Sequence, residues 1–457
     1  MDNFYNINGC TLDNTQIEAI EADNKSVLLV AGAGSGKTLT ILGKIKYLIE
    51  VKNYKEEEIL CISFTNETVA SLVKKIPYDV NVFTFHKLGL SILGNSYSIV
   101  DDKYLPYIID EYFNSIIYDD VRRKELKRVL YFDGRIDKLL LSREYFNLKR
   151  LILTFIKLAK GDGYSLVDLY SFYKRTIFME RIILKYIIEI FILYSSELRS
   201  INKIDFDDMI SLAKTYVKDA NLKYKYIIID EFQDTSFVRY SLIKEIIKYT
   251  DSKIFVVGDD YQSIYRFSGC NLDIFLNFNK YFEDAKTYYL RYTYRNSNQL
   301  IFVSCSFIMK NKLQLKKNIE SSINLDKPIK VLIGYSFKKC LSLIEDQNDI
   351  LVIGRNNSDI QDIPWDNKLT IHRSKGLEAK NVILVNSDSI PSLVENDKLL
   401  RFVITSKDYL LYEEERRLFY VALTRTKSNI FILVNKKISP FVEELLISFK
   451  SYIEVYK

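Results

Sequence analysis

A short stretch rich in glycine has the residue types of a phosphate-binding loop. Glycines let successive backbone N–H groups turn toward a phosphate, a lysine reaches the outer phosphates, and a neighbouring hydroxyl ligates Mg²⁺. The stretch follows an apolar run and precedes an expected helix from Lys37 to about Val51, whose N-terminus points at the same charge. Taken alone, it predicts only that a phosphate is held. Its residues are Ala31, Gly32, Ala33, Gly34, Ser35, Gly36, Lys37 and Thr38, with alanine where the simplest pattern has a first glycine.

Two adjacent carboxylates at the end of a second apolar run supply a partner for this loop. Asp230 and Glu231 follow the run Tyr-Ile-Ile-Ile at 226–229. Here Asp230 would hold Mg²⁺ through water, with Thr38 as the other metal ligand, and Glu231 would orient and deprotonate the water that attacks a γ-phosphate. An Asp-Glu pair often marks only the end of a strand. After a phosphate loop, however, it favours hydrolysis of a nucleoside triphosphate.

Further polar side chains could complete such a site. The amide of Gln16, in a short capped helix expected over 12–20, can offer both a donor and an acceptor to an adenine edge. Gln262 could sense a γ-phosphate, and the aromatic residues beside it could stack on bases. Arg295 and Arg425 lie in a later part of the chain that has no second phosphate loop, so they are candidates for cations supplied across a cleft between two domains. Each of these residue types, taken singly, is more often an ordinary surface residue.

The elements that must position these residues alternate between strand and helix patterns. Buried strands are expected at 59–65, 80–85, 226–229 and 254–260, which predicts a parallel α/β sheet with ligands at the carboxyl ends of its strands. After about Cys270 a second α/β pattern begins. Its strands are expected at 331–333, 349–353, 369–372, 381–386 and 429–434.

Residues 89–203 have a different texture from the rest of the chain. Long helical periodicities there predict an inserted helical subdomain. Its basic run at 122–128 either touches a phosphate backbone or forms a solvated helix face.

Length and composition agree with a folded protein of several domains. The chain has 457 residues, of which 48% are hydrophobic, and this excludes a disordered chain. Its net charge of +6 permits nucleic-acid binding without requiring it. Five scattered cysteines and two histidines indicate neither a zinc site nor an iron–sulfur cluster. Because no leader pattern and no apolar span of about 18 residues occurs, we expect a soluble, cytoplasmic protein without membrane contact.

The ordered set of motifs resembles the UvrD/Rep family of superfamily 1A helicases along nearly the whole chain. The first motifs are Leu12 to Gln16, the phosphate loop, Phe64-Thr65-Asn66, Thr84-Phe85-His86-Lys87 and Ile229 to Asp234. The later ones are Gly258 to Gly269, Tyr294-Arg295, Ile371 to Glu378 and Glu413 to Arg425. Nine motifs in the same order make a chance agreement negligible.

The resemblance implies a fold, two cofactors and a role for each motif. It implies two RecA-like P-loop domains that use ATP and Mg²⁺ and move 3′ to 5′ on single-stranded DNA. Gln16 would read adenine, Tyr294 would stack on it, and Glu378 would hydrogen-bond the ribose side. Arg295 and Arg425 would contact the γ-phosphate, and Gln262 would couple phosphate occupancy to the strand. The implied strand path contains Phe64, Asn66, His86, Tyr265, Phe267 and His372.

The resemblance also implies domain boundaries. Residues 1–88 and 204–275 would form domain 1A, residues 89–203 the helical domain 1B, and residues 276–457 domain 2A. Thr370 follows Arg295 by only 75 positions, so the 2B subdomain of larger members is expected to be absent or vestigial. Likewise, the 32 residues after Arg425 leave no room for the nuclease domain of some relatives.

Two residues depart from the family's usual pattern. Glu67 stands where a lysine is usual, and Phe267 where a tryptophan is usual. Both substitutions are expected to weaken or retune contacts with the strand without removing them.

Three functions fit the motifs to different degrees. The leading hypothesis is an ATP-dependent 3′-to-5′ translocase and helicase acting on single-stranded DNA or on a junction of single-stranded and duplex DNA. A second is a DNA-dependent ATPase subunit that senses nucleic acid and regulates a partner nuclease, with little unwinding alone, as in the helicase component of Gabija-type anti-phage systems. A third, a P-loop enzyme acting on a small molecule, leaves the aromatic and histidine motifs unexplained.

Overall fold

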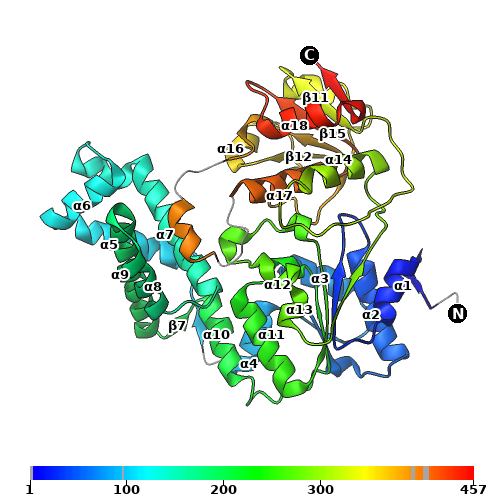
Figure 1. Ribbon diagram of the computed structural model, residues 1–457, viewed down its shortest axis with the longest axis horizontal. Coiled ribbons are helices and arrows are strands. Elements are labelled where there is room, and N and C mark those ends of the chain that lie inside the picture. Colours follow the sequence, from blue (N-terminus) through cyan, green and yellow to red (C-terminus); the bar gives the residue numbers. More distant parts are fainter. Residues whose placement is uncertain (1–3, 95–96, 393–396, 405–410) are drawn as a thin grey trace.

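Two parallel sheets and a group of helices make up the molecule. The computed structural model describes residues 4–94, 97–392, 397–404 and 411–457. Figure 1 shows the two sheet domains, one above the other in this view, with the helices α5 to α9 at one side. The strand orders are β10-β3-β9-β8-β4-β5 and β13-β12-β14-β15-β11-β16. All the strand pairs described in these two sheets are parallel, so the predicted α/β fold with two parallel sheets is confirmed.

The first sheet carries the phosphate loop at the end of an interior strand, β3. Its inner strands are runs of Val, Ile and Leu buried on both faces, as parallel strands covered by helices must be. The strands are β3 (Ser26–Val30), β4 (Ile59–Ser63), β5 (Asn81–Thr84), β8 (Tyr226–Ile229), β9 (Lys253–Gly258) and β10 (Ala285–Tyr289). The helices are α1 (Asn14–Glu21), α2 (Lys37–Glu50), α3 (Asn66–Lys75), α4 (Phe85–Leu93), α10 (Phe206–Tyr216), α11 (Phe237–Thr250), α12 (Leu272–Leu276) and α13 (Phe278–Tyr281).

The first sheet extends further along the chain than the sequence indicated. Strand β10 pairs with β3, from Ala285 opposite Ser26 to Tyr289 opposite Val30. The second domain, expected from residue 276, therefore begins only after Tyr289. As an edge strand with largely exposed side chains, β10 lacks the unbroken apolar run by which buried strands are recognised.

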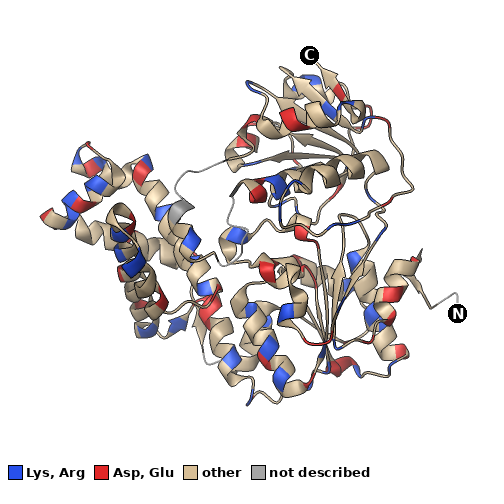
Figure 2. Ribbon diagram, in the orientation of Figure 1, with Lys and Arg blue, Asp and Glu red and all other residues tan. Residues whose placement is uncertain are grey.

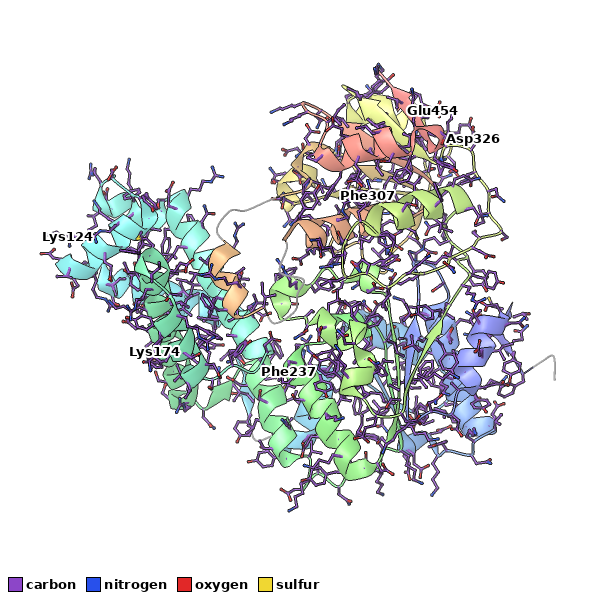
Figure 3. All side chains as sticks on the ribbon, viewed as in Figure 1. Lys124, Lys174, Phe237, Phe307, Asp326 and Glu454 are labelled. Carbon is purple, nitrogen blue, oxygen red and sulfur yellow. The ribbon has the colours of Figure 1, made fainter. Side chains whose placement is uncertain are left out.

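The second sheet contains strands at all five positions where the sequence indicated them, and β16 in addition. β13 ends at Thr370, so His372 lies in the turn that follows and not in the strand as expected. Phe307, labelled in Figure 3, joins α14 to α17 and α18 through its contacts with Phe419 and Phe441. The strands are β11 (Ile329–Ile333), β12 (Ile350–Gly354), β13 (Lys368–Thr370), β14 (Ala379–Leu384), β15 (Thr426–Val434) and β16 (Ile453–Tyr456). The helices are α14 (Asn298–Ile308), α15 (Phe337–Leu341), α16 (Asn357–Ile360), α17 (Leu411–Leu423) and α18 (Pro440–Ser448).

The helical insertion has a hydrophobic core of its own. A short parallel pair, β6 (Ser98–Ile99) with β7 (Lys203–Ile204), joins the place where the chain enters it to the place where the chain leaves. Acidic and basic residues are interspersed along its helices in Figure 2, and Lys124 lies at its outer end in Figure 3. Within the described ranges, no helix is both long and apolar enough to cross a membrane. The helices are α5 (Tyr104–Ile116), α6 (Asp120–Leu130), α7 (Arg143–Gly161), α8 (Leu166–Arg175) and α9 (Phe178–Ser200).

A segment of the second domain completes the core of the helical insertion. The short helix η8 (Asp397–Phe402) follows β14 in the chain, yet Leu399 and Val403 are buried among the side chains of α5 to α9. The ring of Phe402 stacks on that of Phe172 at 5.5 Å between centroids, and Arg401 pairs with Glu180 at 2.9 Å. We call residues 399–404 the docking segment, because they fasten the second domain to the insertion.

The docking segment leads to a prediction about stability. Leu399→Ala removes a nearly fully buried side chain and leaves a cavity, so we expect a loss of about 2–4 kcal/mol from the helical insertion. Leu343→Ala is the matched control, because Leu343 is 38% exposed. Thermal unfolding followed by circular dichroism measures both. Equal melting temperatures for the two variants would show that Leu399 is not part of the core.

Candidate nucleotide and strand-binding sites

The phosphate loop is held in place by the strands on both sides of it. The N–H of Ala31 donates to the carbonyl of Gly258 at 2.9 Å, which continues the pairing of β3 with β9. Gly36 adopts φ 81° just before α2 begins, a conformation that favours glycine. Asp13 and Thr65 cap α1 and α3 with side-chain hydrogen bonds, but no side chain caps α2. The first N–H groups of α2 therefore remain available to an anion.

Lys37 and the two carboxylates after β8 meet at this loop. Lys37 Nζ donates to Glu231 Oε1 at 2.7 Å, and Asp230 Oδ1 accepts the N–H of Glu231 at 2.9 Å. Burial opposes the charge on Lys37, but Glu231 and Asp230 hold its pKa above the ordinary value. Burial likewise opposes ionisation of Glu231, but Lys37 and Lys375 hold its pKa below the ordinary value. Glu231 is therefore ionised at neutral pH and can act as a base.

Two arginines of the later half of the chain lie close enough for their charges to interact. Arg295 Nε donates to Glu378 Oε2 at 2.7 Å, and its Nη1 donates to the carbonyl of Thr424 at 3.3 Å. Arg425 is fully buried and donates to Gln262 Oε1 at 3.0 Å. Burial, and then the neighbouring charge of Arg295, lower the pKa of Arg425 to about 9. A pair of cations in this position would be stabilised by an anion such as a terminal phosphate.

The segment that carries Arg295 lies directly on the phosphate loop. Tyr294 N–H donates to the carbonyl of Gly34 at 2.9 Å, and Thr293 Oγ1 donates to the carbonyl of Ala33 at 2.7 Å. The packing is so close that a Cβ on Gly34 would lie 2.4 Å from the Cβ of Arg295. Only glycine fits there, because the second segment approaches the loop's backbone.

Gln16 and Tyr294 both lie next to Gly36. Asp13 and Gln16 form a capping box at α1, which fixes Gln16 Oε1 on the N–H of Asp13. Gln16 is fully buried, and its Nε2 has no hydrogen-bond partner in the described part of the chain. A Cβ on Gly36 would lie 2.5 Å from this Nε2 and 3.7 Å from the ring of Tyr294. An unsatisfied donor beside an exposed aromatic ring suits an adenine, so the residues present fit ATP.

Two residues are expected to hold Mg²⁺, and this small number of protein ligands is typical of that ion. Thr38 lies in the first turn of α2 and Asp230 at the end of β8. Across the described residues, no three His, Cys, Asp or Glu side chains are grouped so as to hold a metal ion by themselves. Mg²⁺ usually takes one or two protein ligands together with phosphates and water, so one hydroxyl and one carboxylate fit it.

The residues of the expected strand path form two groups. Tyr265, Phe267 and His372 contact one another, with ring centroids 5.5 to 6.2 Å apart, and Tyr265 Oη donates to the carbonyl of His372 at 3.1 Å. Phe64 and His86 lie near Arg239 instead, whose guanidinium is 5.3 Å from the ring centroid of Phe64.

Among the residues expected to contact the DNA strand, Asn66 and the two histidines differ in exposure and charge. Asn66 is exposed at the start of α3. Burial and the neighbouring arginines, Arg355 and Arg239 respectively, lower the pKa of His372 and of His86 to about 4, so both are neutral at pH 7.

Lys317 is a buried residue that the motifs did not reveal. Its Nζ donates to the carbonyl of Ala31 at 3.0 Å, lies 2.7 Å from Asp260 Oδ1, and forms a short ion pair with Asp259. Asp259 also accepts Gln262 Nε2 at 2.6 Å. No motif surrounds Lys317, and the adjacent Lys316 looks the same in sequence but is exposed.

Lys375 is a second such cation. It pairs with Asp234 at 2.5 Å and donates to the carbonyl of Gln262 at 2.8 Å. Its sequence motif alone assigns it no role. Its contacts join the second domain to the loop after β8.

Comparison with known proteins identifies the family of the chain. The UvrD/REP helicase N-terminal domain family matches residues 12–283, more than half of the chain. The chain belongs to the UvrD/Rep helicase family. The UvrD-like helicase C-terminal domain matches residues 367–437 in addition.

Relatives of this family member vary in length. DNA helicase IV of Escherichia coli K12 is 27% identical over 97% of this chain and 71% of its own. The probable DNA helicase II homolog of Mycoplasma capricolum is 32% identical over 67% of this chain and 42% of its own. The ATP-dependent DNA helicase Rep of Buchnera aphidicola from Schizaphis graminum is 28% identical over 75% and 52%. This chain thus spans about half or less of the length of the Mycoplasma and Buchnera proteins.

The match to the structure of the PRRSV helicase covers 93% of this chain and 54% of the PRRSV helicase chain. The identity is 9% and the TM-score 0.39, a likeness too weak to bear on the fold.

The ion pairs of Lys317 lead to a prediction. Lys317→Met leaves Asp259 and Asp260 buried without their cation, so we expect the first domain to lose about 3–5 kcal/mol of stability. Lys316→Met is the control, because it removes the same charge from an exposed neighbour. Chemical denaturation measures the two variants. If Lys316→Met destabilises the protein as much, the buried ion pairs are not the cause.

Proposed function

We propose that this chain is an ATP-dependent translocase that moves 3′ to 5′ on single-stranded DNA and unwinds duplex DNA. The observation that carries the proposal is the position of Arg295 and Arg425. The segment that carries Arg295 packs on the phosphate loop, and Arg425 donates to Gln262, three residues before Tyr265 in the chain. Relatives named as DNA helicases support it. One site would thus hold ATP and another the strand, with a few residues between them.

The nucleotide site supplies groups for each part of the hydrolysis. Thr38 and Asp230 would hold Mg²⁺, which neutralises charge on the outer phosphates when bound. Lys37 would exchange its bond to Glu231 for one to a phosphate oxygen. Glu231, then free of that bond, would accept a proton from the attacking water. Arg295 and Arg425 would stabilise the charge that develops on the transferred phosphoryl group.

A short chain of contacts connects the two sites. Gln262 accepts from Arg425 through its side chain and from Lys375 through its carbonyl. Lys375 Nζ also lies 4.8 Å from the ring centroid of Tyr265. A phosphate that draws Arg425 toward itself would therefore disturb Gln262 and, through Lys375, the ring of Tyr265. This connection would provide the coupling that a motor requires.

The test of the proposal is ATP hydrolysis with and without single-stranded DNA, together with an assay of direction. We expect oligothymidylate to stimulate hydrolysis and streptavidin to be displaced from the 5′ end of a biotinylated strand, not from the 3′ end. A protein that binds ATP but gains no activity with DNA would overturn the motor. Strong unwinding by the chain alone would argue against the second hypothesis, a subunit that regulates a partner nuclease.

Two substitutions separate binding from chemistry. Glu231→Gln keeps the shape but removes the base, so we expect ATP to bind while kcat falls by about 10²–10⁴. Lys37→Ala should also abolish hydrolysis, but through loss of phosphate contact, and should weaken ATP binding. Equilibrium binding of a fluorescent ATP analogue and single-turnover hydrolysis distinguish the two variants. Hydrolysis by Glu231→Gln at the native rate would show that its assigned role is wrong.

A further inference from the structure

Two glycines let helix α1 come close to the phosphate loop and to helix α2, which follows the loop (Figure 1). At Gly36, a Cβ would lie 2.5 Å from Nε2 of Gln16. At Gly43, a Cβ would lie 2.6 Å from Cδ1 of Ile20 and 3.1 Å from Cδ1 of Leu12. Glycine inside a helix is less stable than alanine, and Gly43 lies within α2. The advantage of glycine at this position is therefore the close packing of α1.

Lys44, the residue after Gly43, binds the C-terminal end of α1. Its Nζ donates to the carbonyl of Ile20 at 2.7 Å and to that of Ala22 at 2.8 Å. The last carbonyls of a helix have no partner within the helix, and a cation beside them also offsets the negative end of the helix dipole. We call Gly43 and Lys44, with their contacts to Ile20 and Ala22, the α1 clamp.

The surroundings of Lys44 hold its side chain in one place. The residue is 1% exposed, and its Nζ lies 5.3 to 5.5 Å from the ring centroids of Tyr47, Tyr226 and Phe255. Burial lowers the pKa of Lys44 to about 7. The ammonium has three N–H groups and the neutral amine still has two, one for each carbonyl. The contact with α1 is therefore possible in both protonation states.

Helix α1 carries Gln16, the residue proposed to read adenine. Its Oε1 accepts the N–H of Asp13, and an amide oxygen has a second lone pair. With the Nε2 that has no partner among the described residues, this amide suits N6 and N7 of adenine, whereas guanine would present O6 to the same oxygen. The discrimination depends on where the amide lies relative to the phosphates. Because the phosphate loop leads into α2, the packing of α1 on α2 sets that distance.

We propose that Gly43 and Lys44 are positioning residues, which hold α1 against α2 and thereby give the nucleotide site its preference for adenine. Both act through Gln16 and not by contact with the nucleotide. The inference rests on the proposed function, because it takes the site to bind ATP through Gln16. Base recognition is then determined about two turns along the helix that follows the phosphate loop, outside the recognised motifs.

Equilibrium binding tests the α1 clamp without hydrolysis and without DNA. We measure Kd values for fluorescent N-methylanthraniloyl derivatives of AMPPNP and GMPPNP in the presence of Mg²⁺. We expect the wild type to prefer the adenine analogue by about tenfold or more, as a bidentate amide contact allows, and Gln16→Ala to lose this preference. Lys44→Met should lose most of it as well, through weaker binding of the adenine analogue.

Lys46→Met is the matched control for Lys44→Met. Lys46 lies on the same helix, and its Nζ also donates to a backbone carbonyl, that of Phe4 at 2.8 Å. Phe4 is not part of α1, so we expect Lys46→Met to keep the preference for adenine.

Gly43→Ala tests the α1 clamp without leaving a buried polar group unpaired. The added Cβ meets Cδ1 of Ile20, so α1 must shift, and we expect the preference for adenine to fall although alanine favours the helix. Ile20→Val removes this Cδ1. The double variant Gly43→Ala/Ile20→Val should therefore regain the preference. Thermal unfolding followed by circular dichroism shows that each variant is folded.

The outcomes separate this inference from the proposed function. If Lys44→Met or Gly43→Ala keeps the wild-type preference while Gln16→Ala loses it, the α1 clamp is overturned and the reading of adenine is not. A wild type without any preference would overturn both, whereas movement on DNA is decided by the streptavidin assay. In the Gln16→Ala background, Lys44→Met should change the preference no further. A further change would show that Lys44 does not act through Gln16.

Discussion

The arrangement around the phosphate loop depends on the buried ion pairs between one lysine and two aspartates. Lys317 belongs to the segment that runs from α14 to β11, yet its ammonium lies among Asp259, Asp260 and the carbonyl of Ala31 in the first domain. Burial opposes its charge, but the two carboxylates hold the pKa of Lys317 above its ordinary value. A buried charge of this kind is costly to separate from its partners. The connection between the domains is thus fastened to the phosphate loop itself.

The same connecting segment also lies beside the residues that precede Arg295. The carbonyl of Glu320 accepts the N–H of Thr293, and Glu320 N–H donates to Arg291, so the segment after Lys317 lies beside the one before Arg295. Both cover the loop, which explains why Gly34 tolerates no side chain. Asp259, the partner of Lys317, also holds the amide of Gln262 that faces Arg425. The same carboxylate therefore supports the connection between the domains and the residue expected to report on the phosphate.

Motifs whose functional residues lie close together in the chain were predictable from the sequence. Contacts between residues far apart in the chain were not. The phosphate loop and the pair Asp230 and Glu231 are contiguous motifs, because one turn of backbone must present several groups at once. The two parallel sheets followed from apolar runs. By contrast, Lys317 and its aspartates lie more than fifty positions apart, and no local pattern distinguishes it from Lys316.

Edge and docking elements escaped prediction for a related reason. Strand β10 is exposed along much of its length, so it has no apolar run to reveal it. The docking segment lies between β14 and α17 in the chain, and its leucines indicate burial but not where. Whether an apolar side chain packs against its own domain or another is decided by the tertiary arrangement, which periodicity does not contain.

The docking segment has a mechanical consequence for a two-domain motor. If the two sheets change their separation when ATP binds, the second domain moves relative to the first. Residues 399–404 belong to the second domain by sequence and to the insertion by packing, with Val403 fully buried there. The chain enters and leaves the insertion through β6 and β7, which pair with each other, and Gly161 of α7 lies in close contact with Gly269 of the first domain. The insertion is therefore attached to both domains, and a change in their separation would strain one of these attachments.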